Sequence, residues 1–307
     1  MTELATAEAL TGTARGGRRT PQDRPAREGA WQRTRRLARF LLRSPGLVLS
    51  VVLVALVTVS AFLPGVFTSR DPLSGVPRER LRGPGADHLF GTDQLGRDLF
   101  ARVVHGSALS LQATVVAVAV GLVVGSLLGL LAGYLGGRVD DALMRVVDVL
   151  LAIPSLLLSL AVVTALGFGT VKVAVAVGIA SVASFARVMR SEVLRVRGAV
   201  YVEAAHSAGA RRLSVLFRHV LPNSAGPVLV YAAVDFGAVI LQVSTLSFLG
   251  YGAVPPTPEW GSLVSGGRDY LATAWWLTTL PGLTIAATVL AANRISRALD
   301  GEGRETR

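Results

Sequence analysis

Six long apolar runs constrain the fold of this chain more than any other feature of its sequence. A bilayer core about 30 Å thick is crossed by about 20 residues of α-helix, and each run is long enough to cross it. The runs cover approximately residues 45–67, 107–134, 143–166, 171–189, 226–250 and 275–295. Only 17% of the 307 residues are charged, whereas soluble domains have about 25%. The sequence therefore predicts an all-α membrane protein with six transmembrane helices.

The arginines predict the orientation of these helices. Residues 1–44 contain ten arginines and four acidic residues, and basic residues accumulate on the cytoplasmic side of membrane proteins. With a cytoplasmic N-terminus and six spans, residues 190–222, with six arginines and two acidic residues, are cytoplasmic as well. Residues 68–106 and 251–274 are nearly neutral and fall on the opposite side. Because the arginines lie at the ends of apolar runs, the net charge of +11 indicates membrane topology and no nucleic-acid partner.

These patterns divide the chain into segments. Residues 1–44 form a cytoplasmic basic tail, and their Gly-, Arg- and Pro-rich composition predicts that most of it is disordered. The basic region and the apolar run after it are both too long for a cleavable signal peptide. The remaining segments are a first transmembrane helix at 45–67, an extracytoplasmic segment at 68–106, a five-helix core at 107–297 and a cytoplasmic tail at 298–307.

The cytoplasmic loop contains a short motif with a defined spacing. Its residues are Glu203, Ala204, Ala205, Gly209, Leu221 and Pro222. The alanines are small enough for another surface to approach closely. Gly209 can adopt the left-handed conformation that ends one short helix before the next begins, and Pro222 is expected to stop the second helix. The motif resembles the EAA loop of permease subunits of ATP-driven importers, and an ordinary amphipathic loop helix is the alternative.

Six further segments narrow this resemblance. They are residues 90–98, 218–223, 247–250, 255–261, 274–276 and 281–282. Together they resemble the C-type permease subunit of dipeptide, oligopeptide and nickel ABC importers over about residues 35–292. The resemblance implies the type I ABC importer permease fold in the cytoplasmic membrane. It also implies that the chain moves di- or oligopeptides by alternating access, with nickel or another small solute as the alternative substrate.

The same resemblance implies the partners of the chain. They are a second permease subunit, two ATPase subunits or domains and an extracytoplasmic solute-binding protein, besides membrane lipid. In that family the EAA loop docks into a groove on the ATPase, and ATP and Mg²⁺ are bound by the ATPase subunits.

The residues of this chain predict no chemistry of their own. The sequence has no phosphate-binding G-x-x-x-x-G-K-[ST] loop, so no cofactor is expected in the chain. It has no cysteine and its four histidines have no metal-ligand spacing, so no metal site is expected either. A membrane enzyme would need paired acids or clustered histidines at one depth, and a passive channel would need no ATPase-docking loop. Neither alternative matches the sequence.

Three features inside the spans predict helix environments. The second span has a glycine at every fourth position, and this face is expected to pack closely against another helix. These residues are Gly121, Gly125, Gly129 and Gly133. Asp235, within the fifth span, is expected to line a translocation path, because ionisable residues in spans avoid lipid. Asp148 is a weaker candidate, because Arg145 one turn earlier can pair with it. Trp275 and Trp276 are expected to anchor the outer end of the sixth span in an aromatic belt.

Overall fold

The computed structural model describes residues 45–305, and the chain from Gly46 onward forms one compact unit. The tail at residues 1–44, and residues 306–307 of the expected C-terminal tail, lie outside the described residues. Within the described part the secondary structure is helical apart from two isolated β-bridges, Gly75 with Arg97 and Thr92 with Asp98. The prediction of an all-α protein is confirmed.

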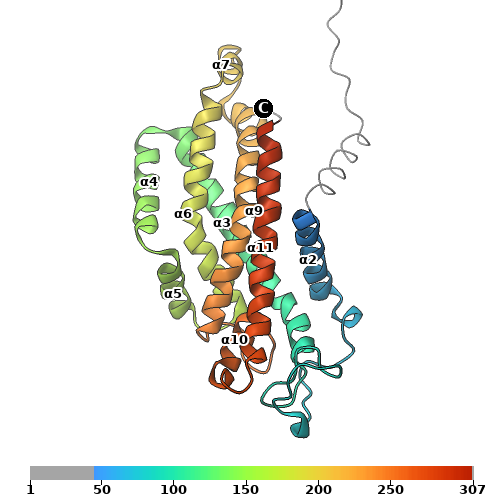
Figure 1. The fold of residues 1–307 in the computed structure, drawn as a ribbon. Coiled ribbons are helices and arrows are strands. Elements are labelled where there is room, and N and C mark those ends of the chain that lie inside the picture. Colours follow the sequence, from blue (N-terminus) through green and yellow to red (C-terminus); the bar gives the residue numbers. More distant parts are fainter. Residues whose placement is uncertain (1–44, 306–307) are drawn as a thin grey trace, which may run out of the picture. The chain divides into compact units, whose positions relative to one another are not determined.

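Most helices follow one another through short connections, whereas the long segment 63–98 joins α2 to α3 (Figure 1). In chain order they are α2 (Pro45–Phe62), α3 (Leu99–Leu135), α4 (Gly137–Ala152), α5 (Ser155–Leu166), α6 (Thr170–Arg197), α7 (Val200–Ser207), α8 (Arg212–Val215), α9 (Leu221–Phe248), α10 (Trp260–Gly267) and α11 (Trp276–Glu305). The 3-10 turns are η1 (Pro64–Val66), η2 (Pro77–Glu79) and η4 (Arg268–Tyr270), and η3 (Leu216–Val220) is a π-helical turn. Figure 1 shows α7 at one end of the bundle and α10 at the other.

Among the described residues, five helices are long and apolar enough to cross a membrane, or six if α4 and α5 form one bent span. The third apolar run is bent, as expected for a span that contains a proline, Pro154, and its two halves α4 and α5 meet at an angle of 96°. The break lies at Ile153, which has extended backbone dihedrals of −91° and 128°. Its neighbour Pro154 disfavours the helical conformation in the residue before it.

The α3 helix begins earlier than its apolar run. Asp98 caps the helix, since its carboxylate accepts a hydrogen bond from the backbone N–H of Ala101 at 2.8 Å. The first two turns include Arg102 and His105, so hydropathy alone places the start several residues later. The polar cap and the apolar run thus belong to one helix of 37 residues.

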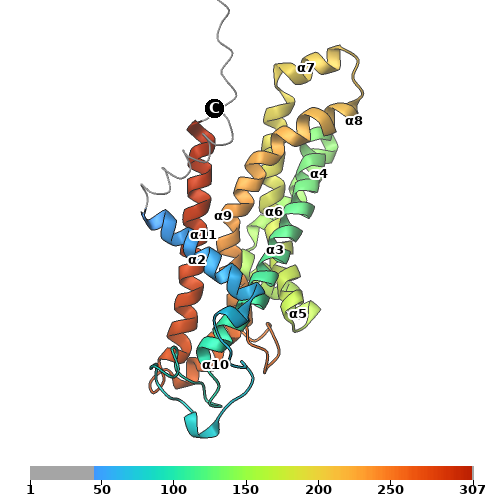
Figure 2. The same cartoon turned by 90° about the vertical axis from the view of Figure 1, so that its right-hand side faces the viewer.

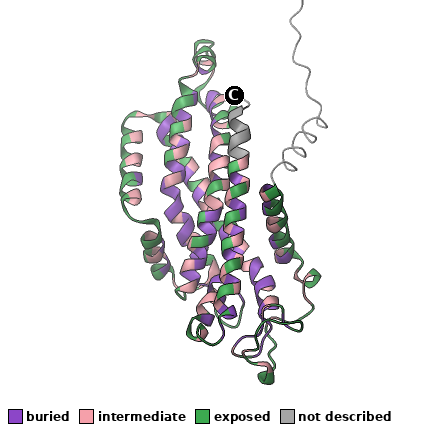
Figure 3. Cartoon of the chain, viewed as in Figure 1, coloured by how far each residue is buried: buried purple, intermediate pink, exposed green. Residues whose placement is uncertain are grey.

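The most extensive contact between helices is that of α3 with α6. All four glycines of the second span face α6, where any side chain would meet the neighbouring helix. A Cβ atom at Gly125 would lie 2.5 Å from the carbonyl oxygen of Val182, and one at Gly133 would lie 2.9 Å from Cγ1 of Val193. Figure 3 shows α6 as the most buried helix of the bundle. The glycines therefore allow α3 to approach the central helix closely.

The α2 helix makes less contact with the other helices. The hydroxyl of Ser60 donates a hydrogen bond to the hydroxyl of Ser107 on α3 at 2.9 Å. A cavity of about 760 Å³ lies among α2, α3, α6, α9 and α11 and is lined mainly by apolar side chains, including Val57, Leu109 and Phe236. One side of α2 thus faces an apolar space inside the unit.

Candidate functional site

The segment between α6 and α9 projects beyond the end of the bundle (Figure 2). Helix α7 is held by Val202, which is 1% exposed and packs in a cluster with Val215 and Val220. On the same helix Glu203 and Ala204 are exposed and Ala205 is half-buried. The anchored residue thus leaves the polar and small side chains of α7 on the surface.

Gly209 forms the turn between α7 and α8. Its φ angle is +82°, in the left-handed region that glycine favours. The backbone N–H of Ala210 donates to the carbonyl of Ala205 at 3.1 Å, which closes the end of α7. A Cβ atom at Gly209 would meet no heavy atom within 4 Å. The glycine is therefore required by the turn itself and not by close packing within this chain.

Pro222 does not stop a helix, which corrects the expectation from the sequence. The chain is helical without interruption from α8 through η3 into α9, and Pro222 is the second residue of α9. At this point the turn is π-helical, and the N–H of Leu221 donates to the carbonyl of Leu216, five residues earlier. This wider turn leaves room for the proline ring. Pro222 is exposed and Leu221 is half-buried.

Large apolar side chains are exposed around this projection. Val200, Tyr201, Leu213 and Phe217 are 81%, 46%, 67% and 62% exposed. An apolar group of this kind on a surface is typical of a contact site for another protein. The sequence analysis missed these residues, although apolar side chains in an arginine-rich loop were a detectable signal.

The projection is tied to the end of α3. The hydroxyl of Tyr134 donates a hydrogen bond to the carbonyl of Arg212 at 2.5 Å, and Arg197 Nη1 donates to the carbonyl of Gly133 at 3.2 Å. A displacement of α7 and α8 would therefore act directly on α3 as well as on α6 and α9.

Asp235 lies on α9 at its interface with α6. It is partly buried, and its Oδ2 atom is buried with no hydrogen-bond partner in the described part of the chain. Ser181 on α6 lies beside the same carboxylate. An incompletely satisfied carboxylate inside a span is unusual, which makes Asp235 a candidate for contact with a ligand or another subunit.

Asp148 does not pair with Arg145, in contrast to the alternative considered from the sequence. Its Oδ1 accepts a hydrogen bond from Nη2 of Arg187 on α6 at 2.6 Å. Both side chains remain largely exposed, at 62% and 58%. The partner is therefore a residue distant in sequence, which only the packing of α4 beside α6 brings close.

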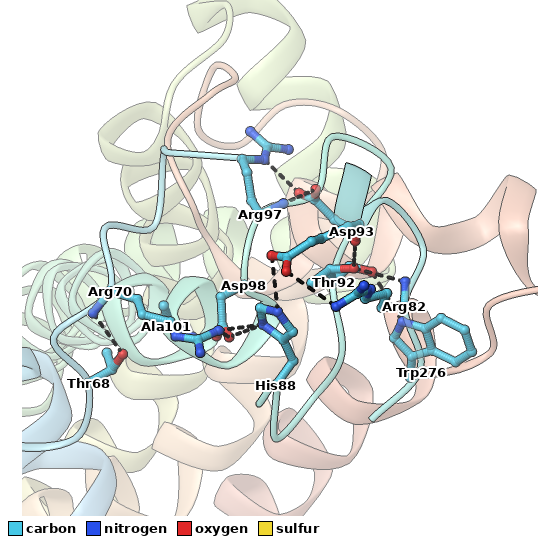
Figure 4. Close-up of polar contacts among 11 residues, drawn as sticks. Thr68, Arg70, Arg82, His88, Thr92, Asp93, Arg97, Asp98, Ala101 and Trp276 are labelled. Atoms are coloured by element: carbon cyan, nitrogen blue, oxygen red, sulfur yellow. Dashed lines mark hydrogen bonds and ion pairs between the residues drawn. The ribbon is translucent and has the colours of Figure 1, made fainter. Parts of the chain in front are cut away.

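A polar network organises residues 68–98 at the α10 end (Figure 4). The carboxylate that caps α3, that of Asp98, also contacts Arg70 Nη1 and His88 Nδ1, each at 2.8 Å. Asp93 binds Nε of Arg97 at 2.6 Å. Trp276 is 8% exposed and donates from Nε1 to the carbonyl of Thr92 at 3.2 Å. Trp276 is thus a loop anchor and not the belt residue that the sequence predicts.

Glu259 is a second buried carboxylate at this end and caps α10. Its side chain is 0% exposed and accepts hydrogen bonds from the N–H groups of Gly261 and Ser262, both at 3.1 Å, and from the hydroxyl of Ser110 at 3.3 Å. Burial raises the pKa of Glu259, although these hydrogen bonds oppose the shift. Trp260 donates from Nε1 to the carbonyl of Val103 at 3.0 Å. The segment 255–261 therefore fastens α10 to α3.

Comparisons with known proteins give consistent matches. Residues 125–302 match the family model described as binding-protein-dependent transport system inner membrane component. The dipeptide transport system permease protein of Alkalihalophilus pseudofirmus is 38% identical over 280 residues, which cover 91% of each chain. The di/tripeptide transport system permease protein of Pseudomonas aeruginosa is 44% identical over 217 residues, 71% of this chain and 72% of that one.

A solved structure has a similar fold. The crystal structure of an amino acid ABC transporter with histidines superimposes with a TM-score of 0.52 at 14% identity, covering 66% of this chain and 95% of the other. At this identity the likeness concerns the fold alone.

Proposed function

Because the chain belongs to the family of binding-protein-dependent transport system inner membrane components, we propose that it is a peptide-translocating permease subunit of an ATP-driven importer. It is a multi-pass, all-α membrane protein with the fold of such permeases. The peptide substrate is supported by relatives whose names specify dipeptide and di/tripeptide transport. Their alignments cover most of both chains.

The projection formed by α7, Gly209 and α8 is the proposed coupling site, and this geometry carries the proposal. It presents Glu203 and Ala204 on an exposed short helix beside exposed apolar side chains, which suits docking to an ATPase subunit. The arginine distribution supports a cytoplasmic position for this projection. The chain is helical without a break from α8 through Leu221 and Pro222 into α9. A movement of the projection therefore passes directly into α9.

The other partners follow from this orientation. A second permease subunit completes the path, and the extracytoplasmic binding protein docks at the α10 end, near residues 68–98. ATP and Mg²⁺ bind to the ATPase subunits, and hydrolysis shifts the permease pair between two states through differences in their contacts. Asp235 borders the path between the two permease subunits.

Uptake by a strain that lacks this gene tests the proposal. We expect the strain to lose ATP-dependent uptake of a labelled tripeptide and to regain it with the wild-type gene. Nickel uptake, measured in parallel with ⁶³Ni²⁺, is expected to stay unchanged. Loss of nickel uptake with normal peptide uptake would replace the proposed substrate with the alternative one.

A further inference from the structure

Four polar contacts join neighbouring helices along one part of the bundle. Arg187 on α6 binds Asp148 on α4 at 2.6 Å, and Gln242 on α9 donates to the hydroxyl of Ser155 on α5 at 3.3 Å. Between them, Ser184 and Ser181 of α6 lie beside Tyr231 and Asp235 of α9. We call these eight residues the polar seam. They are Asp148, Ser155, Ser181, Ser184, Arg187, Tyr231, Asp235 and Gln242.

The charges of the polar seam are unsuited to a lipid-facing surface. Arg187 and Asp148 are more than half exposed in this chain. Arg187 lies about 25 Å along α6 from Thr170, which is within a bilayer core of about 30 Å. A charged side chain facing hydrocarbon costs about 3 kcal/mol on insertion scales, so such residues face a water-filled path or another protein. The exposed pair therefore identifies the side of the bundle that lipid does not cover.

Two residues of the polar seam, Asp235 and Arg187, carry opposite charges and lie at different depths along the bundle. Asp235 lies beside Ser181, and Arg187 follows Ser181 by six positions on the same helix. Six residues of α-helix rise about 9 Å. An extended peptide spans about 3.3–3.6 Å per residue, so the ammonium and carboxylate groups of a tripeptide are separated by a similar distance.

Both Asp235 and Arg187 retain unused binding capacity. Oδ2 of Asp235 has no hydrogen-bond partner among the described residues. One hydrogen bond, from Nη2, joins Arg187 to Asp148, whereas Arg190 binds Asp140 through two, at 2.5 Å and 2.7 Å. A guanidinium group has five N–H donors arranged to bind a carboxylate through two of them. If another carboxylate takes the place of Asp148 on Arg187, Asp148 is exposed enough to be hydrated by water instead.

From this arrangement we propose that the polar seam binds the peptide in transit, with Asp235 contacting its ammonium group and Arg187 its terminal carboxylate. Asp148 is the resting partner of Arg187. This inference rests on the proposed function and deepens it, because it assigns two residues that select zwitterionic peptides of about three residues. Arg190 is the matched control, because it forms the neighbouring α4–α6 ion pair but lies outside the polar seam.

The test uses the complete importer, with its binding protein, in proteoliposomes. Two substrates are compared, a tripeptide and its C-terminal amide, chosen by calorimetry to bind the binding protein equally well. We expect the wild type to transport the free peptide about tenfold faster than the amide, which corresponds to about 1.4 kcal/mol. In Arg187→Gln this ratio should fall to about one, whereas Arg190→Gln should keep the wild-type ratio even if both rates decline.

Two further variants guard against a purely structural effect. Arg187→Lys retains the charge, so it should keep part of the preference for the free peptide over the amide. This variant provides the test if Arg187→Gln fails to assemble. Asp235→Asn should reduce selection of the free peptide over its N-acetyl form without altering selection against the amide. A wild-type ratio of one, or an unchanged ratio in Arg187→Gln, would overturn the inference. A wild-type complex that transports neither peptide but transports another solute would contradict the proposed function itself, and the inference would fall with it.

Discussion

Gly209 is the residue whose backbone most narrowly limits substitution in the proposed coupling site. Its φ angle of +82° is poorly accessible to residues with a Cβ atom, although the surrounding space is open. We expect Gly209→Trp to leave the helices folded and to abolish uptake, because it disturbs both the turn and the docking surface. Peptide uptake and co-purification of the ATPase measure the two effects.

A matched substitution separates these causes. Asparagine tolerates the left-handed conformation better than most residues, so Gly209→Asn should retain more uptake than Gly209→Trp. Normal uptake by a correctly assembled Gly209→Trp complex would rule out the coupling role of this turn.

Asp235 is the second residue for which a single change is informative. Asp235→Asn preserves the shape of the side chain and removes its charge. We expect transport to fall while the complex stays assembled, and the loss should depend on the charge of the substrate, because a carboxylate beside the path attracts cationic groups. Uptake assays and size-exclusion chromatography provide the measurements.

The exposed residue Asp141 on α4 lies outside the polar seam and the proposed docking sites. It supplies a control in Asp141→Asn, which should transport normally. Dissociation of the permease pair by Asp235→Asn would make Asp235 structural. A cysteine at position 235 that reacts only with lipid-soluble reagents would contradict its place beside the path.

At the scale of elements, the contact of α3 with α6 depends on the absence of side chains. At Gly125 an added Cβ would lie 2.5 Å from both the Val182 carbonyl oxygen and Cβ of Phe185. Gly125→Leu should therefore force the two helices apart and destabilise the fold by about 1–3 kcal/mol. Thermal unfolding of the protein in detergent, followed by tryptophan fluorescence, should show a lower midpoint. The control Val124→Leu, at a neighbouring position that is 43% exposed, should unfold as the wild type does.

Proline has different effects on two elements of this protein. Pro154 follows Ile153, whose extended backbone separates α4 from α5 at 96°. Pro222 follows a π-helical turn and lies inside continuous helix. The π-helical turn before Pro222 leaves room for the proline ring, whereas Pro154 follows a residue in extended conformation. The presence of a proline therefore predicts that a helix is perturbed, but it does not predict whether the helix breaks or continues.

For the whole molecule, the absence of a phosphate-binding loop in the sequence predicts that the chain has no ATPase activity of its own. Purified alone, it should show no specific binding of a fluorescent ATP analogue, because its sequence lacks the motif that forms a backbone cradle for the phosphates. The assembled importer is the positive control, since its ATPase subunits should bind the analogue. Saturable binding by the isolated chain at micromolar concentration would contradict this prediction.

The sequence by itself determined the helical class, the approximate positions of the spans and the spacing of the Glu-Ala-Ala motif. These depend on apolar length and on local backbone preference, which neighbouring residues specify. Gly209 is of this kind, since a left-handed turn is a property of the residue itself.

Only the tertiary structure decided which side chains meet. Asp148 pairs with Arg187 instead of Arg145, and Trp276 binds the Thr92 carbonyl instead of facing a membrane interface. The polar seam likewise exists only because α4, α5, α6 and α9 pack side by side. Such contacts join residues far apart in the chain, and their partners are chosen by helix packing and bend angles, which no local pattern in the sequence specifies.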